Sequence, residues 1–207
     1  MGKIAAAVVL AFAVAASGQA PEVDGHEEIR PYLTPEAYRI YAILFPKDSS
    51  SKGHRSIVIL QETQAAPFPA PLRDCLLGLD VRQERGDQTL SRSVIEDFHR
   101  VNQVPKLLVE GQLQFVASHT LASRTAIKQS FNGGIEQGWR EFYKRFPMSS
   151  GYSVVSAVGF NEAMTQALVY LEHHCGGLCG FAEVLLLEKT DGKWQEVPHA
   201  TGCGWKF

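Results

Sequence analysis

The chain has 207 residues, of which 45% are apolar and 20% are charged. This length suits one domain, and the apolar share excludes a chain that is disordered throughout. The 20 lysines and arginines against 22 aspartates and glutamates give a formal net charge of −2. So flat a balance gives no electrostatic argument for nucleic acid, and we expect no nucleic-acid partner. Heptads and internal repeats are missing from the sequence, which excludes coiled coils and solenoids.

Residues 1–20 read MGKIAAAVVLAFAVAASGQA. Lys3, the apolar run Ile4–Ala16 and the small residues after it are typical of a secretory signal peptide. As a helix the run would span about 20 Å, short of the roughly 30 Å hydrocarbon core of a bilayer. We expect cleavage after Gly18 or two residues earlier, and no stable membrane anchor, because Gln19 stands where lipidation would need a cysteine. The protein is then exported, periplasmic or extracellular. A buried N-terminal helix is the alternative.

Beyond the signal peptide, we expect a flexible lead-in at 19–33 and a single domain at 34–207. Thr34 followed by Pro35 is typical of a helix start and predicts a helix over 34–45. The continuous β-branched run Ser56–Leu60 predicts a buried strand. Prolines on alternate positions then predict a Pro-rich arm at 64–73, which cannot hold a regular strand ladder.

A Ser-x-x-Glu capping box at 93–96 predicts a second helix, which Pro105 ends. Residues 107–116 fit a strand or a helix equally well, because Gly111 interrupts them. A third, amphipathic helix is predicted by apolar residues at helical spacing, and Pro147 ends it. Those residues are Ile135, Trp139, Phe142, Tyr143 and Phe146.

The last sixty residues change to strand-forming patterns. Asp191-Gly192 between two such segments predicts a tight hairpin. Short connections make neighbouring strands antiparallel, so these segments predict a meander, with the Trp139 helix covering its apolar face. The fold class is therefore α+β, with N-terminal helices packed on a C-terminal antiparallel β-meander. The four predicted strands are Tyr152–Phe160, Gln166–His173, Phe181–Lys189 and Lys193–Val197.

Four cysteines follow the signal peptide, and an even number in an oxidising compartment suggests two disulfides. The Gly-Gly-Leu spacer between Cys175 and Cys179 favours a local bridge. Cys75 would then pair with Cys203 and close a long loop, which stabilises a fold by about 4 kcal/mol.

His173, His174, Cys175 and Cys179 form the densest group of potential metal ligands in the chain. A zinc or copper site is the alternative there to a disulfide-closed turn, and a redox-active pair of thiols is a third reading. Adjacent histidines on a strand point to opposite faces, so only one could share a site with the cysteines. We therefore expect the disulfide, and neither a metal nor another cofactor.

Sequence motifs for common enzymes are missing: no GxSxG, HExxH, Walker or GxGxxG pattern occurs. Candidate residues for a hydrolase are only those that any chain of this size offers, and we assign no catalytic residue from them. The group Glu96, Asp97 and His99 could do acid–base chemistry, although Glu96 is explained by the capping box. The other candidates are Ser149, Ser150, Ser153, His119 and His199.

Five segments in the last third of the chain follow one another in a recognisable order: SAVGFN (156–161), QALVY (166–170), CGGLCG (175–180), LLEK (186–189) and GKW (192–194). In this order they resemble a group of uncharacterised exported bacterial proteins, over about residues 139–197. The resemblance implies a bacterial source and an envelope location, and it transfers no activity and no site residue.

These observations favour a non-catalytic binding or envelope-associated domain. A secreted hydrolase with its site between the helices and the sheet is one alternative, and a metal-binding protein that uses the HHCGGLC segment is another. A cleft that holds a hydroxyl beside an Asp-His pair would favour the hydrolase, whereas an apolar groove would favour a binding domain.

Overall fold

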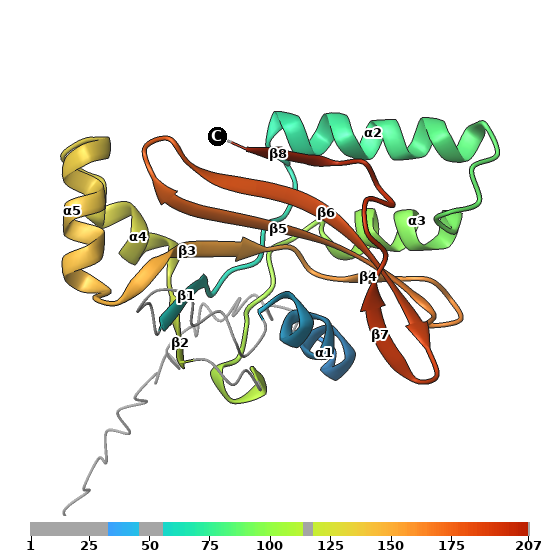
Figure 1. Cartoon of the computed structure of the whole chain (residues 1–207), viewed down its shortest axis with the longest axis horizontal. Coiled ribbons are helices and arrows are strands. Elements are labelled where there is room, and N and C mark those ends of the chain that lie inside the picture. Colours follow the sequence, from blue (N-terminus) through green and yellow to red (C-terminus); the bar gives the residue numbers. More distant parts are fainter. Residues whose placement is uncertain (1–32, 46–55, 114–117, 207) are drawn as a thin grey trace, which may run out of the picture.

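The computed structural model describes residues 33–45, 56–113 and 118–206 (Figure 1). The predicted signal peptide and nearly all of the lead-in lie outside these residues. The described helices are α1 (Pro35–Leu44), α2 (Ala70–Glu84), α3 (Arg92–Val101), the 3-10 turn η2 (Glu110–Gln112), α4 (Arg124–Ser130) and α5 (Ile135–Arg145). The described strands are β1 (Ser56–Leu60), β2 (Ser118–Ala122), β3 (Ser149–Val155), β4 (Gly159–Phe160), β5 (Gln166–Gly176), β6 (Cys179–Thr190), β7 (Lys193–Glu196) and β8 (Gly204–Lys206).

All described strands join one sheet, in the order β2-β1-β3-β5-β6-β7, with β4 beside β5 and β8 beside β6. The predicted meander is confirmed, because β3, β5, β6 and β7 pair antiparallel in succession. The α+β class holds, but the helices do not simply precede the sheet. The strands β1 and β2 lie between helices in the chain and extend the sheet through parallel pairing.

The Asp191-Gly192 hairpin is also confirmed. Both residues have positive φ, 51° and 75°, as a tight two-residue turn between twisted strands requires. Thr190 pairs with Lys193 directly across this turn. At the opposite end of β6, the hairpin that joins β5 to β6 contains the Cys175–Cys179 disulfide.

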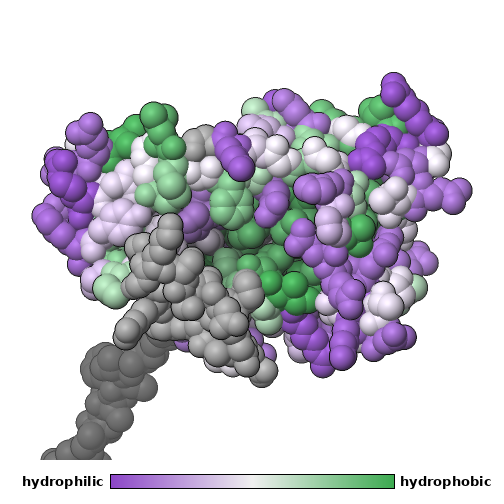
Figure 2. Space-filling model, in the orientation of Figure 1, coloured by the Kyte–Doolittle hydropathy of each residue, from purple (hydrophilic) through white to green (hydrophobic). Residues whose placement is uncertain are grey.

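Apolar residues of β5 and β6 are buried on both faces of the sheet. Ala167, Val169 and Leu171 belong to the core under α1, whereas Leu168 and Tyr170 belong to the core under α2 and α3. In Figure 1, α2 lies above the sheet and α1 below it. A strand covered on both faces carries a continuous apolar run rather than an alternating one. Figure 2 shows hydrophobic residues gathered near the middle of this view, with hydrophilic residues around them.

The helix that carries Trp139, α5, covers only one end of the sheet, together with α4 (Figure 1). Phe142 is fully buried there against Val58 and Val154 of β1 and β3. Ile135, the first residue of the predicted apolar stripe, is 64% exposed. The expectation that this helix covers the meander is therefore corrected, because α2 and α3 cover β5 and β6 on the same face.

The helix starts agree in part with the predictions. Thr34 caps α1 by accepting a hydrogen bond from Ala37 N at 3.3 Å. The cap of α3 is Ser91, which accepts from Val94 N at 3.3 Å, and not the expected Ser93. The physical reason is a tertiary contact: Ser91 N donates to the side chain of Gln166 at 2.7 Å, which places this serine at the helix start.

The predicted Pro-rich arm is shorter than 64–73, because α2 begins at Ala70. Pro71 sits in the first turn of a helix, where a missing N–H costs nothing. Before α2 the chain lies on the domain, since Gln64 forms a bridge with Ser156 and Ala66 N donates to Asn102 O at 2.9 Å. The helix α2 was not predicted, although its buried residues recur at helical spacing: Leu72, Leu76 and Leu79.

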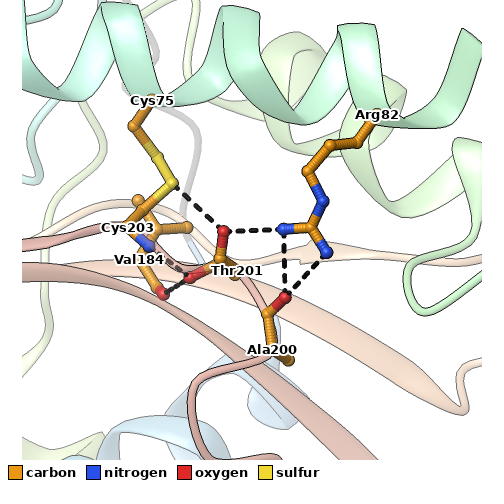
Figure 3. The surroundings of a disulfide bond; sticks show 6 residues. All are labelled: Cys75, Arg82, Val184, Ala200, Thr201 and Cys203. Carbon is orange, nitrogen blue, oxygen red and sulfur yellow. Dashed lines mark hydrogen bonds between the residues drawn. A yellow bond between two sulfur atoms is a disulfide. The ribbon is translucent and has the colours of Figure 1, made fainter. Parts of the chain in front are cut away.

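The second disulfide joins Cys75 on α2 to Cys203, with 5.7 Å between the two Cα atoms (Figure 3). Both disulfides are therefore the pairs that the sequence favours. Arg82, two turns further along α2, donates to Thr201 O at 2.8 Å. Thr201 in turn donates through Oγ1 to Val184 O at 2.6 Å. The segment before β8 is thus held between α2 and β6 by covalent and polar contacts.

None of the described helices is both long and apolar enough to cross a bilayer.

Candidate functional site

A cavity of about 780 Å³ opens between the start of α1 and the exposed side of α3. It lies beside β4, a short strand that pairs only with β5 among the described strands. Its walls are residues 33–37, part of α3, Lys106 and most of the segment 157–164. The volume falls within the range of about 300–1,000 Å³ that is typical of small-molecule sites.

The SAVGFN segment forms the inner wall of this cavity. Gly159 lets α3 approach, because a Cβ at this position would lie only 2.5 Å from the backbone N and Cα of Phe98. The buried Asn102 side chain then ties the end of α3 to this segment: its Oδ1 accepts from Ala157 N at 2.8 Å and its Nδ2 donates to Ala157 O at 3.0 Å. These contacts fix the inner wall relative to α3.

The same segment is fixed to α1 on the other side. Tyr41 Oη donates to Ser156 O at 2.8 Å, and Ser156 Oγ accepts from Tyr170 N at 2.9 Å. All three residues are buried. At the end of the segment, Asn161 Oδ1 accepts from the backbone N–H groups of the following turn, including Thr165 N at 2.8 Å. The cavity is therefore preformed between two helices that are both anchored to its wall.

Four of the described lining residues are carboxylates, and three of them already have partners within the protein. Glu36 accepts from Lys189 Nζ and from Trp194 Nε1, both at 2.6 Å, and these bonds lower the pKa of Glu36. Asp97 accepts from Arg100 Nε at 3.0 Å and from Phe160 N at 2.9 Å.

Glu96 pairs with Arg92 at 2.9 Å, so it is not the capping residue that the sequence predicted. The fourth carboxylate, Glu162, lies on an exposed turn.

Two of the described lining residues are cations, and one of them has an ion-pair partner among the described residues. Arg100 is engaged by Asp97. Lys106 is half-buried, and within the described residues its ammonium makes no ion pair. Its backbone is held rigidly, since Lys106 N donates to Thr63 Oγ1 and Thr63 N donates to Lys106 O, both at 2.9 Å. Burial and the neighbouring Arg100 charge lower the pKa of Lys106, while Asp97 acts in the opposite direction.

Apolar side chains supply the remaining surface, among them Val101, Val158 and Phe160. The described lining includes no histidine and no cysteine, and its hydroxyl groups belong to Thr34, which caps α1, and to Ser93. Chemically, the cavity offers an apolar wall next to a charged rim. Such a surface can bind a small amphipathic molecule.

The HHCGGLC segment lies elsewhere, at the far end of β5. Cys175 and Cys179 are joined in a disulfide, so neither is free to bind a metal. His173 Nδ1 lies 3.0 Å from Ser153 Oγ, whereas His174 Nε2 lies 2.8 Å from a Glu172 oxygen. The described residues contain no group of three or more potential ligands that could hold a metal ion.

Ser153 and His173 form a serine–histidine contact that the sequence analysis did not single out. They are opposite each other on β3 and β5, and Ser153 is only 3% exposed. The imidazole also hydrogen-bonds the Ser150 backbone and packs on the Phe181 ring at 5.6 Å. Burial lowers the pKa of His173. A carboxylate, which a triad would need, is not among these contacts.

The other candidate catalytic residues are dispersed. Ser149 Oγ donates to Phe146 O at 2.8 Å, and His99 Nε2 lies 3.5 Å from Asp80, outside the cavity. Asp97 is turned toward Arg100, so it does not form an acid–base group with His99. The other two candidate histidines do not line the cavity either. His119 Nε2 lies 3.1 Å from Glu110, and His199 occupies a turn with φ of 58°.

The cavity was not predicted, because its walls come from segments that are distant along the chain. The available signal was the SAVGFN segment, which was noted only for its resemblance to other proteins. No protein-family model matches the chain, and neither a curated protein nor a solved structure is significantly similar to it.

Proposed function

We propose that this protein is an exported domain that binds a small amphipathic molecule in the cavity between α1 and α3. The observation that carries the proposal is the preformed cavity of about 780 Å³, with an apolar wall and a charged rim. Buried hydrogen bonds from Asn102 and Tyr41 hold its wall in place. A site that is already shaped before the ligand arrives avoids the entropic cost of ordering it.

Export is supported by the two disulfides, since such bonds persist in oxidising compartments. The signal-peptide pattern of residues 1–20 and the resemblance to exported bacterial proteins support the same location. Binding is favoured over hydrolysis because two of the lining carboxylates, Glu36 and Asp97, are already engaged by cations of the protein. A general acid or base needs a proton position that is open to substrate.

The test is a ligand screen on the full chain exported to a bacterial periplasm. A panel of acidic, neutral and basic amphipathic molecules is examined by saturation-transfer NMR and by thermal unfolding. A ligand at one hundred times its Kd should raise the free energy of unfolding by about 2.7 kcal/mol. If a member of the panel is hydrolysed in the same samples, the hydrolase alternative is favoured over a binding domain.

Two matched variants locate the binding. Val101→Trp fills the cavity from α3, where Val101 is half-buried and lines it. Val104→Trp is the control, because Val104 is 50% exposed and lies outside the cavity lining. We expect at least a tenfold weaker binding in V101W and unchanged binding in V104W. Equal binding by both variants, or no binding by any member of the panel, would refute the proposal.

A further inference from the structure

We propose that the ligand of this cavity is an organic anion with an apolar body, and that Lys106 pairs with its carboxylate. This inference rests on the proposed function, because it names the chemical class that the cavity between α1 and α3 accepts.

The described lining residues include four carboxylates and two cations. Three of these carboxylates and one of these cations have charged partners among the described residues, which leaves Glu162 and Lys106. Glu162 is exposed and stays hydrated, so it needs no partner. Lys106 is half-buried, and a cation that is partly removed from water needs a counter-charge. Among the charged groups of the described lining, Lys106 therefore gains most from an added anion.

Partial burial and the charge of Arg100 lower the pKa of Lys106, while Asp97 acts in the opposite direction. A bound anion offsets the effect of Arg100, because an anion is attracted to both cations. Asp97 already holds Arg100 through Nε at 3.0 Å, so Arg100 adds potential while Lys106 supplies the free donors.

The backbone of Lys106 is fixed by two hydrogen bonds to the buried Thr63, one to the Thr63 hydroxyl and one from the Thr63 N–H, so the ammonium extends from a fixed point. Val101 and Val158 line the same cavity and present only hydrocarbon. A carboxylate at Lys106 thus places the rest of the ligand against an apolar wall, which favours an aliphatic or aromatic body over a sugar or an inorganic anion.

The experiment compares octanoate, octanamide and octylamine by isothermal titration on the full chain. These three probes have similar linear alkyl bodies and carry an anionic, a neutral and a cationic head group. We expect octanoate to bind at least tenfold more tightly than octanamide, and octylamine to bind most weakly. Lys106→Met should abolish the difference between octanoate and octanamide, and Lys106→Arg should retain it.

Lys128→Met is the matched control, because Lys128 is an exposed lysine on α4 outside the cavity lining, and it should behave as the wild type. Thermal unfolding of each variant confirms that it is folded. Equal affinity for octanoate and octanamide in the wild type would overturn this inference and leave the cavity as a binding site. Tighter binding of octylamine would overturn it in favour of Glu162. If no probe binds and the wider panel also fails, the proposed function itself is wrong.

Discussion

Removing the long disulfide should cost far more stability than removing the short one. The Cys75–Cys203 bond closes a loop of 128 residues, and the Cys175–Cys179 bond closes one of 4. With the loop-entropy relation, these closures correspond to about 4.9 and 1.9 kcal/mol at 25 °C. The double variants C75A/C203A and C175A/C179A should therefore differ by about 3 kcal/mol in their free energy of unfolding.

Urea unfolding followed by tryptophan fluorescence measures both variants against the wild type. A domain of this size has only about 5–15 kcal/mol of net stability, so C75A/C203A should be marginally folded. Its m-value should also rise, because an unfolded chain without the long cross-link exposes more surface. The contact of Arg82 with Thr201 remains in this variant and keeps the C-terminal segment near α2 while the protein is folded (Figure 3).

The comparison can fail in a defined way. If C175A/C179A loses as much stability as C75A/C203A, loop entropy does not govern the effect, and the packing of the β5–β6 hairpin would have to be the larger contribution. An unchanged m-value in C75A/C203A would also contradict the reasoning. A variant that is unfolded without urea counts as the larger loss.

Two further predictions concern glycine and histidine positions. Gly78→Ala should stabilise the protein by about 1 kcal/mol, because a Cβ on this exposed helix face meets nothing within 4 Å. Gly159→Ala should destabilise it by about 1–3 kcal/mol, because the added Cβ clashes with Phe98. Thermal unfolding measures both variants, and equal effects would contradict the close approach of α3 to Gly159. Burial lowers the pKa of His173 in the folded state below the ordinary 6.5, so the unfolded chain binds the proton more readily and stability is lost as pH falls below about 6.5. Between pH 7.5 and 5.5, the free energy of unfolding measured in urea should fall less in His173→Gln than in the wild type. The same fall in both proteins would contradict a contribution of His173 to the loss of stability.

Much of the architecture follows from local patterns. The Asp191-Gly192 turn and the Thr34 cap form as predicted, because the residues that satisfy them lie within four positions of each other. The local Cys175–Cys179 bridge follows for the same reason, and the pairing of the other two cysteines follows by elimination.

Features that depend on distant contacts were missed or misplaced. The start of α3 moved to Ser91 because Gln166, far along the chain, binds its backbone N–H. The helix α2 was not predicted, because the alternate prolines before it suggested an irregular arm, and its leucines pack in one cluster with residues of β6. The pairing of β1 with β2 and β3 is parallel, and no hairpin signal marks a parallel pair.

The sequence by itself determined the predicted export signal, the α+β class, the C-terminal meander and its main hairpin turn, because each depends on neighbours along the chain. Only the tertiary structure decided where the cavity lies and which charges remain unmatched in it. Asp97 and Lys106 are close in sequence, but their roles differ because Arg100 and Phe160 engage the first, while the second faces the cavity with no ion-pair partner among the described residues. Charge matching depends on distances in three dimensions, and a one-dimensional pattern does not contain them.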